Sequence, residues 1–303
     1  MGKKAALLYI MALMIITMLA ACDSSPPTAI NEIPEVPEEI IEPEEIYIDS
    51  EQYTYKTLIW SDEFDGKELD ETKWRAMIGT GESEGYPPNW GNHELQYYTK
   101  ENAFIRDGKL VISIKSKRHK NMSYTSSRLT TSDLFSFTYG RVEARIKLPD
   151  CEPGIWPAFW MLPDGLPTEW AYGTWAASGE IDIMEARSRI PDEISGAAHY
   201  GGKWPNNVYS VGSFSFPDSG SISDWNVYTI EWFPDKIIWY INGLEYFRLN
   251  DWHTTGESKP KPFDQPFCLI LNVAVGGTFD GGRKPSANFE EAEMLVDWVR
   301  VYQ

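Results

Sequence analysis

The chain has 303 residues, of which 42% are hydrophobic and 14% aromatic, and its formal net charge is −18. A balance this acidic argues against nucleic acid or anionic polysaccharide as the ligand, because both would be repelled. The four histidines show no metal-ligand spacing, and the sequence contains neither a glycine-rich phosphate loop nor a Cys-x-x-Cys pair. These absences favour a neutral ligand and no cofactor for catalysis.

Residues 1–22 are predicted to be a targeting segment. Lys3 and Lys4 precede an apolar run from Ala5 to Leu19, and residues 19–22 read Leu-Ala-Ala-Cys. The run is too short and wrongly flanked for a membrane span, and is typical of a secretory signal. Its end resembles the lipobox of bacterial lipoproteins, so we expect lipid on Cys22. An ordinary cleaved signal with an incidental cysteine is the alternative.

Residues 23–51 are predicted to form an acidic tether. They include ten acidic residues, five prolines and neither Lys nor Arg. Such a segment buries too little apolar surface to offset its ordering entropy, and its charges repel one another. We expect it to hold a folded domain away from a membrane to which only the lipid attaches the chain. The protein would then be an exported bacterial lipoprotein at the cell surface or facing the periplasm.

Residues 52–303 are long enough for one large all-β domain, and no repeat or second linker divides them. The tether carries −10 and residues 1–22 carry +2, which leaves a formal charge of −10 for the domain. For Cys151 and Cys268 we favour unpaired thiols over a disulfide, because a core of this size needs no cross-link. We expect a monomer.

The domain shows short strand patterns separated by turn residues and no long helical period. Pro234-Asp235 and Asn242-Gly243 predict two tight hairpins, the second with a favoured two-residue turn. The pattern predicts a jelly-roll β-sandwich of two antiparallel sheets with a concave substrate cleft. The predicted strands are 110–114, 141–146, 227–232, 236–241, 268–273 and 295–302.

The segment 139–147 has one apolar and one charged face. The even positions Val142, Ala144 and Ile146 are apolar, whereas odd positions include Arg141, Glu143, Arg145 and Lys147. The even face should pack in the core. We place the charged face in the cleft, where Glu143 and nearby acidic residues would offset the three cations.

The segment 156–161 predicts an aromatic platform. Trp156, Ala158 and Trp160 share one face of a strand. Two indoles flanking an alanine form a flat apolar surface that suits the C–H face of a pyranose. Core packing of both tryptophans is the alternative.

The segment 179–186 reads Gly-Glu-Ile-Asp-Ile-Met-Glu-Ala and contains three candidate catalytic carboxylates. Glu180 and Asp182 share a strand face, whereas Glu185 joins them only if a β-bulge inserts one residue near Ile183-Met184. Three carboxylates would then crowd together, which raises the proton affinity of at least one.

The spacing of the two glutamates suggests a reaction. With the bulge their Cα atoms stand ~13 Å apart, and side chains that lean together would leave ~5 Å between carboxyls. This matches a retaining glycosidase, in which one carboxylate attacks the sugar and the other transfers protons. A Ca²⁺ site and a solvated acidic face are the alternatives.

Several blocks together resemble the family-16 glycoside hydrolases, and within them the bacterial laminarinases, which are endo-acting β-1,3-glucanases. The resemblance spans residues 60–303. Its blocks are Trp60–Asp65, Trp90–Tyr98, Tyr139–Arg145, Trp156–Trp160, Gly179–Ala186, His199–Gly201, Ile270–Gly277 and Asp297–Tyr302.

The resemblance implies roles for individual residues. It makes Glu180 the nucleophile, Asp182 its assistant and Glu185 the acid/base. The residues that it implies in sugar contacts are Asn89, Asn92, Arg145, Trp156, Trp160, His199 and Asn272. It also suggests a structural Ca²⁺ held by backbone oxygens of Glu63 and Gly108 and by the side chain of Asp297.

The implied activity is retaining endo-hydrolysis of a neutral β-1,3-glucan such as laminarin, and of mixed-linkage β-1,3-1,4-glucan as a second substrate. Two alternatives remain. One is a hydrolase of another β-glucan or galactan such as agarose. The other is a noncatalytic surface lipoprotein that binds glucan or serves in adhesion.

Overall fold

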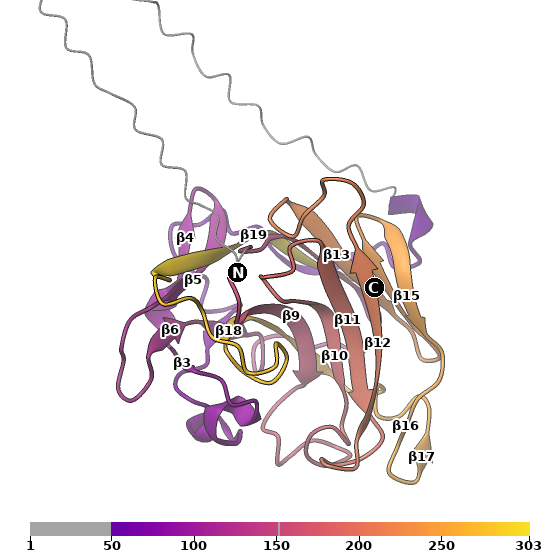
Figure 1. Ribbon diagram of the computed structural model, residues 1–303. Coiled ribbons are helices and arrows are strands. Elements are labelled where there is room, and N and C mark those ends of the chain that lie inside the picture. Colours follow the sequence, from indigo (N-terminus) through magenta and orange to yellow (C-terminus); the bar gives the residue numbers. More distant parts are fainter. Residues whose placement is uncertain (1–49, 151) are drawn as a thin grey trace, which may run out of the picture. The chain divides into compact units, whose positions relative to one another are not determined.

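Two antiparallel-dominated β-sheets form the folded part of the protein (Figure 1). The structure is a computed structural model that describes residues 50–150 and 152–303. The lipobox cysteine Cys22, most of the tether and Cys151 lie outside the described residues. No helix in the described part of the chain is long and apolar enough to span a membrane.

The larger sheet has ten strands in the order β15-β14-β13-β8-β19-β5-β6-β3, with β1 beside β19 and β4 beside β5. Only the β3–β6 pair in this sheet is parallel. The strands are β1 (Leu58–Asp62), β3 (Gln96–Tyr98), β4 (Ala103–Arg106), β5 (Lys109–Lys115), β6 (Tyr124–Ser126), β8 (Gly140–Lys147), β13 (Asn226–Trp232), β14 (Ile237–Ile241), β15 (Leu244–Leu249) and β19 (Glu291–Tyr302).

The smaller sheet has seven strands in the order β12-β11-β10-β9-β18-β7-β2. They are β2 (Arg75–Ala76), β7 (Arg128–Thr130), β9 (Ile155–Pro163), β10 (Glu180–Ala186), β11 (Glu193–Tyr200), β12 (Val208–Ser215) and β18 (Phe267–Val275). The remaining elements are the hairpin β16 (His253–Thr254) and β17 (Glu257–Ser258) and the 3₁₀ turns η1 (Ser50–Gln52), η2 (Glu82–Glu84), η3 (Pro88–Gly91) and η4 (Lys100–Asn102).

All six predicted strands are present, and the two-sheet jelly roll is confirmed. Both predicted hairpins are also present, because β13 pairs with β14 and β14 with β15. Asn242 and Gly243 have φ of 49° and 81°, the positive values that a two-residue hairpin turn requires. Cys268 is a buried free thiol, as expected.

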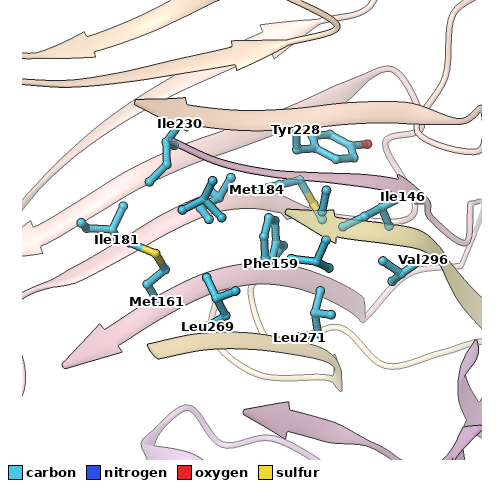
Figure 2. Packing of buried hydrophobic residues seen from close by; sticks show 14 of the residues in the cluster. Ile146, Phe159, Met161, Ile181, Met184, Tyr228, Ile230, Leu269, Leu271 and Val296 are labelled. Atoms are coloured by element: carbon cyan, nitrogen blue, oxygen red, sulfur yellow. The ribbon is translucent and has the colours of Figure 1, made fainter. Parts of the chain in front are cut away.

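The core lies between the two sheets. Figure 2 shows Tyr228 and Ile230 of β13 facing Met184 of β10 and Phe159 of β9. These side chains are almost fully buried, and all of them belong to one hydrophobic cluster. The opposite face of each sheet is therefore left for polar side chains, and we call it the outer face.

The charged face of β8 lies on the ten-stranded sheet, so its predicted place in the cleft is wrong. Val142, Ala144 and Ile146 pack in the core as expected, whereas Arg145 points outward beside Asp297 and Trp225. Alternation fixes which residues share a face of a strand, but it does not identify the sheet to which the strand belongs.

Candidate active site

The predicted β-bulge is present in β10. Asp182 pairs with Trp160 of β9 and Glu185 with Ala158, so two residues of β10 stand against one of β9. The register against β11 shifts over the same residues. Ile183 and Met184 are both buried in the core, although they are consecutive. Glu185 is thereby returned to the outer face that Glu180 and Asp182 occupy.

A tryptophan of the ten-stranded sheet supports this bulge from across the core. A bulge disrupts the ladder locally, and here Trp239 of β14 reaches across the core and donates its Nε1–H to the carbonyl oxygen of Asp182 at 2.8 Å. Gly196 of β11 leaves room for that indole, because a Cβ at this position would lie 2.4 Å from Trp239 Cδ1. Glycine is thus required beside the bulge.

Each glutamate accepts a hydrogen bond from a different tryptophan. Trp156 Nε1 donates to Glu185 Oε1 at 2.9 Å, and Trp175 Nε1 donates to Glu180 Oε2 at 3.0 Å. An indole N–H can only donate, so each bond fixes one carboxylate oxygen and leaves the other oxygen of that group available.

His199 closes the site on the β11 side. Its Nε2 lies 3.4 Å from Asp182 Oδ2 and 3.6 Å from Glu180 Oε1. The ring packs between Trp175 and Tyr209, with centroid distances of 5.5 Å to each. Among the described residues, Glu180, Asp182 and His199 are the one set of three or more carboxylate, His or Cys side chains whose ligand atoms lie close enough for a metal ion.

The electrostatics of the site favour protonation. Burial raises the pKa of Glu180, Asp182 and Glu185 to about 8. The charge of Asp182 adds to the rise at both glutamates, whereas His199 opposes it. In the described part of the chain no Lys or Arg forms an ion pair with the three groups. The cluster therefore titrates as a unit and retains a proton near neutral pH.

The two predicted platform tryptophans lie on the outer face next to the triplet. Trp156 and Trp160 are each partly exposed, while Ala158 between them is buried. Trp156 stacks on Phe279, and Trp160 Nε1 donates to Asn272 Oδ1 at 2.7 Å. The predicted sugar residue Asn272 is therefore in contact with Trp160, although it is itself buried.

The two predicted asparagines differ. Asn92 is near the platform, because its backbone oxygen accepts from Thr278 and lies beside Gly277, against which the Trp156 ring packs. Asn89 has a positive φ of 53° in η3, and its carbonyl oxygen accepts the N–H of Asn92. The contacts of Asn89 shape the loop backbone, and none of them joins it to the triplet.

The prediction that Arg145 contacts substrate is wrong. It lies on the outer face of the ten-stranded sheet, where its Nη1 donates to Asp297 Oδ2 at 2.7 Å. The triplet lies on the outer face of the other sheet, across the core. Membership of a motif block did not reveal this separation, because the block 139–145 contributes mainly to core packing.

The one side chain expected to bind calcium, that of Asp297, is already engaged by two cations in the structure. Asp297 already faces Arg145 and, at 3.6 Å, Lys109 Nζ. A calcium ion here would have to compete with these cations, so the structural calcium stays a prediction and no step below depends on it.

Sequence reasoning missed Trp175, Trp239 and Tyr209. Trp175 lies in the loop before β10, and Trp239 belongs to the opposite sheet, so neither shares a strand pattern with the triplet. Tyr209, on the edge strand β12, is 63% exposed and stacks on His199. Its exposure is visible only in the structure, so the sequence contained no clear signal for it.

Comparisons with known proteins agree with this geometry. The family model described as "Glycosyl hydrolases family 16" matches residues 86–300. The chain is 44% identical over 81% of its length to "Glucan endo-1,3-beta-glucosidase A1" of Niallia circulans, of which it spans 38%. It is 40% identical over 84% of its length to "Beta-glucanase" of Rhodothermus marinus, of which it spans 87%.

A solved structure is also similar. The catalytic domain of an endo-1,3-beta-glucanase (laminarinase) from Thermotoga petrophila RKU-1 aligns with a TM-score of 0.71 at 36% identity. The alignment covers 82% of this chain and 99% of that domain. The similarity therefore extends over nearly all of the described residues.

Proposed function

Because the chain belongs to glycosyl hydrolase family 16, we propose that it cleaves internal β-1,3 linkages of a laminarin-type glucan with retention of configuration. The observation that carries the proposal is the bulge in β10, which brings Glu180, Asp182 and Glu185 to one outer face. The names of the relatives supply the expected linkage. Mixed-linkage β-1,3-1,4-glucan is proposed as a second substrate.

The reaction would proceed by double displacement. In the first step Glu185 gives its proton to the leaving glycosidic oxygen while a Glu180 oxygen attacks the anomeric carbon, which forms a glycosyl ester on Glu180. In the second step Glu185, now ionised, takes a proton from water, and that water displaces Glu180. The raised pKa of Glu185 suits the acid role, since the group must still hold a proton near neutral pH.

Asp182 and His199 would influence the charge states of the two glutamates. Asp182 is 3% exposed and its Oδ2 has no hydrogen-bond partner in the structure. Transfer of the first proton to the sugar leaves a negative charge on Glu185, beside two further carboxyls. His199 Nε2 faces both Asp182 and Glu180, so it is placed to offset that charge.

A neutral substrate follows from the charges near the site. Arg145 lies on the other sheet and Arg141 is buried against Tyr53 and Tyr302. Arg128 lies against Trp160 but is only 3% exposed, and Arg187 donates to Glu193, so these cations are not free to pair with a bound chain. The crowded carboxylates would repel a sulfated polysaccharide. Carrageenan is therefore a poor candidate substrate.

The proposal is tested with purified protein on laminarin, mixed-linkage β-glucan, agarose and carrageenan. Reducing ends are measured and products are sized by chromatography. We expect short oligosaccharides from laminarin, fewer from mixed-linkage glucan, and little from the other two polymers. Oligosaccharides from agarose with none from laminarin would replace this function with the alternative, and binding to laminarin without any cleavage would indicate a noncatalytic protein.

We also propose, from residues 1–51 of the sequence, that the protein is an exported lipoprotein held to a bacterial membrane through Cys22. The signal-like run and the acidic tether support this proposal. Metabolic labelling with a radioactive fatty acid should mark the wild-type protein and not Cys22→Ser. Equal labelling of both would contradict it.

A further inference from the structure

A buried carboxylate lies beneath the platform and belongs to no ion pair among the described residues. Glu94, just before β3, is 3% exposed. Its Oε2 accepts from Gln96 Nε2 at 2.5 Å and from the Tyr98 hydroxyl at 3.2 Å, and its Oε1 accepts from Asn92 Nδ2 at 3.3 Å. Burying such a group is costly unless its donors are all in place.

The bonds from Glu94 continue to the outer face through Tyr98 and Asn272. The Tyr98 hydroxyl accepts from Asn272 Nδ2 at 3.0 Å, and Asn272 Oδ1 accepts from Trp160 Nε1 at 2.7 Å. Tyr98 is fully buried and Asn272 is 5% exposed, so water does not readily replace either partner. We call Glu94, Tyr98, Asn272 and Trp160 the relay.

The chemistry of these groups fixes the direction of every bond in the relay. An indole N–H can only donate, so the amide oxygen of Asn272 must face Trp160. The amide NH₂ then faces Tyr98, whose hydroxyl hydrogen is left for Glu94. Glu94 ends this chain, because its Oε2 accepts from both Tyr98 and Gln96 while its Oε1 accepts from Asn92.

The far end of the relay is next to the reacting groups. Trp160 pairs with Asp182 across the β9–β10 ladder. Its ring is partly exposed, and the guanidinium carbon of Arg128 lies 4.7 Å from the ring centroid. A tilt of this indole would change the surface that a sugar meets beside Asp182.

We propose that Glu94 is a positioning residue that fixes the Trp160 indole through Tyr98 and Asn272, and the Asn92 amide directly, for binding of a neutral glucan chain. The proposal rests on the proposed function. One buried acid would then set the orientation of two polar groups at the platform. A purely structural role is the competing account, since Gln96 also accepts from the Val275 N–H and so ties this segment to β18.

A double-mutant cycle separates the two accounts. Tyr98→Phe and Trp160→Phe each break the relay at a different bond while keeping an aromatic ring. Both are made in the Glu180→Gln protein, and binding of laminarihexaose is measured by calorimetry. We expect each variant to weaken binding about 5- to 20-fold, and the double variant to be no weaker than the worse single one.

Two further variants serve as controls. Tyr97→Phe removes the neighbouring hydroxyl, which bonds Lys120 at the surface. Tyr228→Phe removes a buried core hydroxyl without a partner in the structure. Neither should change laminarihexaose binding, whatever it does to the melting temperature. Glu94→Gln should weaken binding less than Tyr98→Phe does, because its amide oxygen can still accept from Tyr98 and Gln96, whereas its amide nitrogen cannot accept from Asn92.

Failure of the relay proposal can be told apart from failure of the proposed laminarin cleavage. Losses that multiply in the double variant would show that Tyr98 acts independently of Trp160 and would overturn the relay. Unchanged binding in Tyr98→Phe would do the same. If the wild-type protein fails to cleave laminarin, the proposed function falls, whereas multiplicative losses in a protein that does cleave laminarin remove the relay alone.

Discussion

Charged groups on the outer faces of the two sheets lie in different surroundings. On the ten-stranded sheet the charges are paired, as in Arg145 with Asp297 at 2.7 Å and Arg300 with Glu63 at 2.8 Å. On the seven-stranded sheet three carboxylates crowd together, and among the described residues only His199 lies within ion-pair distance of any of them. Ion pairs at the surface contribute little to stability. Buried carboxylates that are not paired with Lys or Arg retain protons near neutral pH, and such protons can be transferred to a substrate.

The largest expected effect is the loss of kcat when Glu180 or Glu185 is replaced. The comparison is a buried glutamate of the other sheet, whose replacement should leave kcat nearly unchanged. Glu180→Gln and Glu185→Gln should each lower kcat on laminarin at least about a thousandfold, because each removes one step of double displacement. Glu143→Gln, on the ten-stranded sheet beside Arg141, should keep kcat within about twofold. Initial rates and circular dichroism are measured for all three.

A loss of activity in Glu143→Gln equal to that in the other two, with an intact fold, would break the comparison between the sheets. Near-normal turnover in either Glu180→Gln or Glu185→Gln would instead remove that residue from the reaction.

The second prediction concerns stability and pH. The folded-state pKa of Glu185 is raised from 4.5 to about 8, so the stability that this group contributes is full below pH 4.5 and is lost as pH rises through about 8. Glu185→Gln removes the ionisation and still accepts from Trp156. The variant should therefore gain about 1 kcal/mol or more over the wild type between pH 5 and pH 9.

Urea unfolding at several pH values measures this gain, and Glu63→Gln is the matched variant. Glu63 is ion-paired with Arg300, so its replacement should not stabilise the protein. A flat difference for Glu185→Gln across the same range would contradict the raised pKa.

The third prediction compares two core tryptophans that each donate to a backbone carbonyl. Trp239→Phe leaves the Asp182 oxygen without its donor, whereas Trp232→Phe affects the oxygen of Phe263. Each should lose about 1 to 3 kcal/mol of stability. Only Trp239→Phe should also lower kcat, by about tenfold, because it loosens the bulge. Equal kcat values in the two variants would show that the bulge needs no such support.

The smallest effect is expected at Arg145. Arg145→Gln breaks a partly exposed pair with Asp297 on the ten-stranded sheet and should change stability by about 1 kcal/mol or less. KM and kcat for laminarin should stay within about twofold of the wild type. A clear rise in KM would restore Arg145 as a substrate residue.

Local patterns of the sequence predicted much of this fold. The alternation around β8, the turn at Asn242-Gly243 and the parity of Glu180, Asp182 and Glu185 depend on neighbours in the chain, and all were confirmed. A bulge could be predicted because Glu185 would otherwise point into an apolar core.

Contacts between distant segments could not be predicted in this way. Trp239 and the Asp182 carbonyl are 57 positions apart, and Tyr98 and Asn272 are 174 apart. Nothing in a strand's own pattern says which sheet it joins, which is why Arg145 was misplaced. Sequence thus predicted the placement of the three carboxylates better than it predicted the residues that hold them.

The most direct test of the retaining Glu180 and Glu185 pair is the anomeric form of the first product. Proton NMR spectra are recorded during the first minutes of laminarin hydrolysis, before mutarotation equilibrates the new reducing ends. Double displacement predicts that the β-anomer appears first and that the α-anomer grows in later. If the α-anomer is released first, a single displacement by water operates and the assignment of Glu180 as nucleophile is wrong.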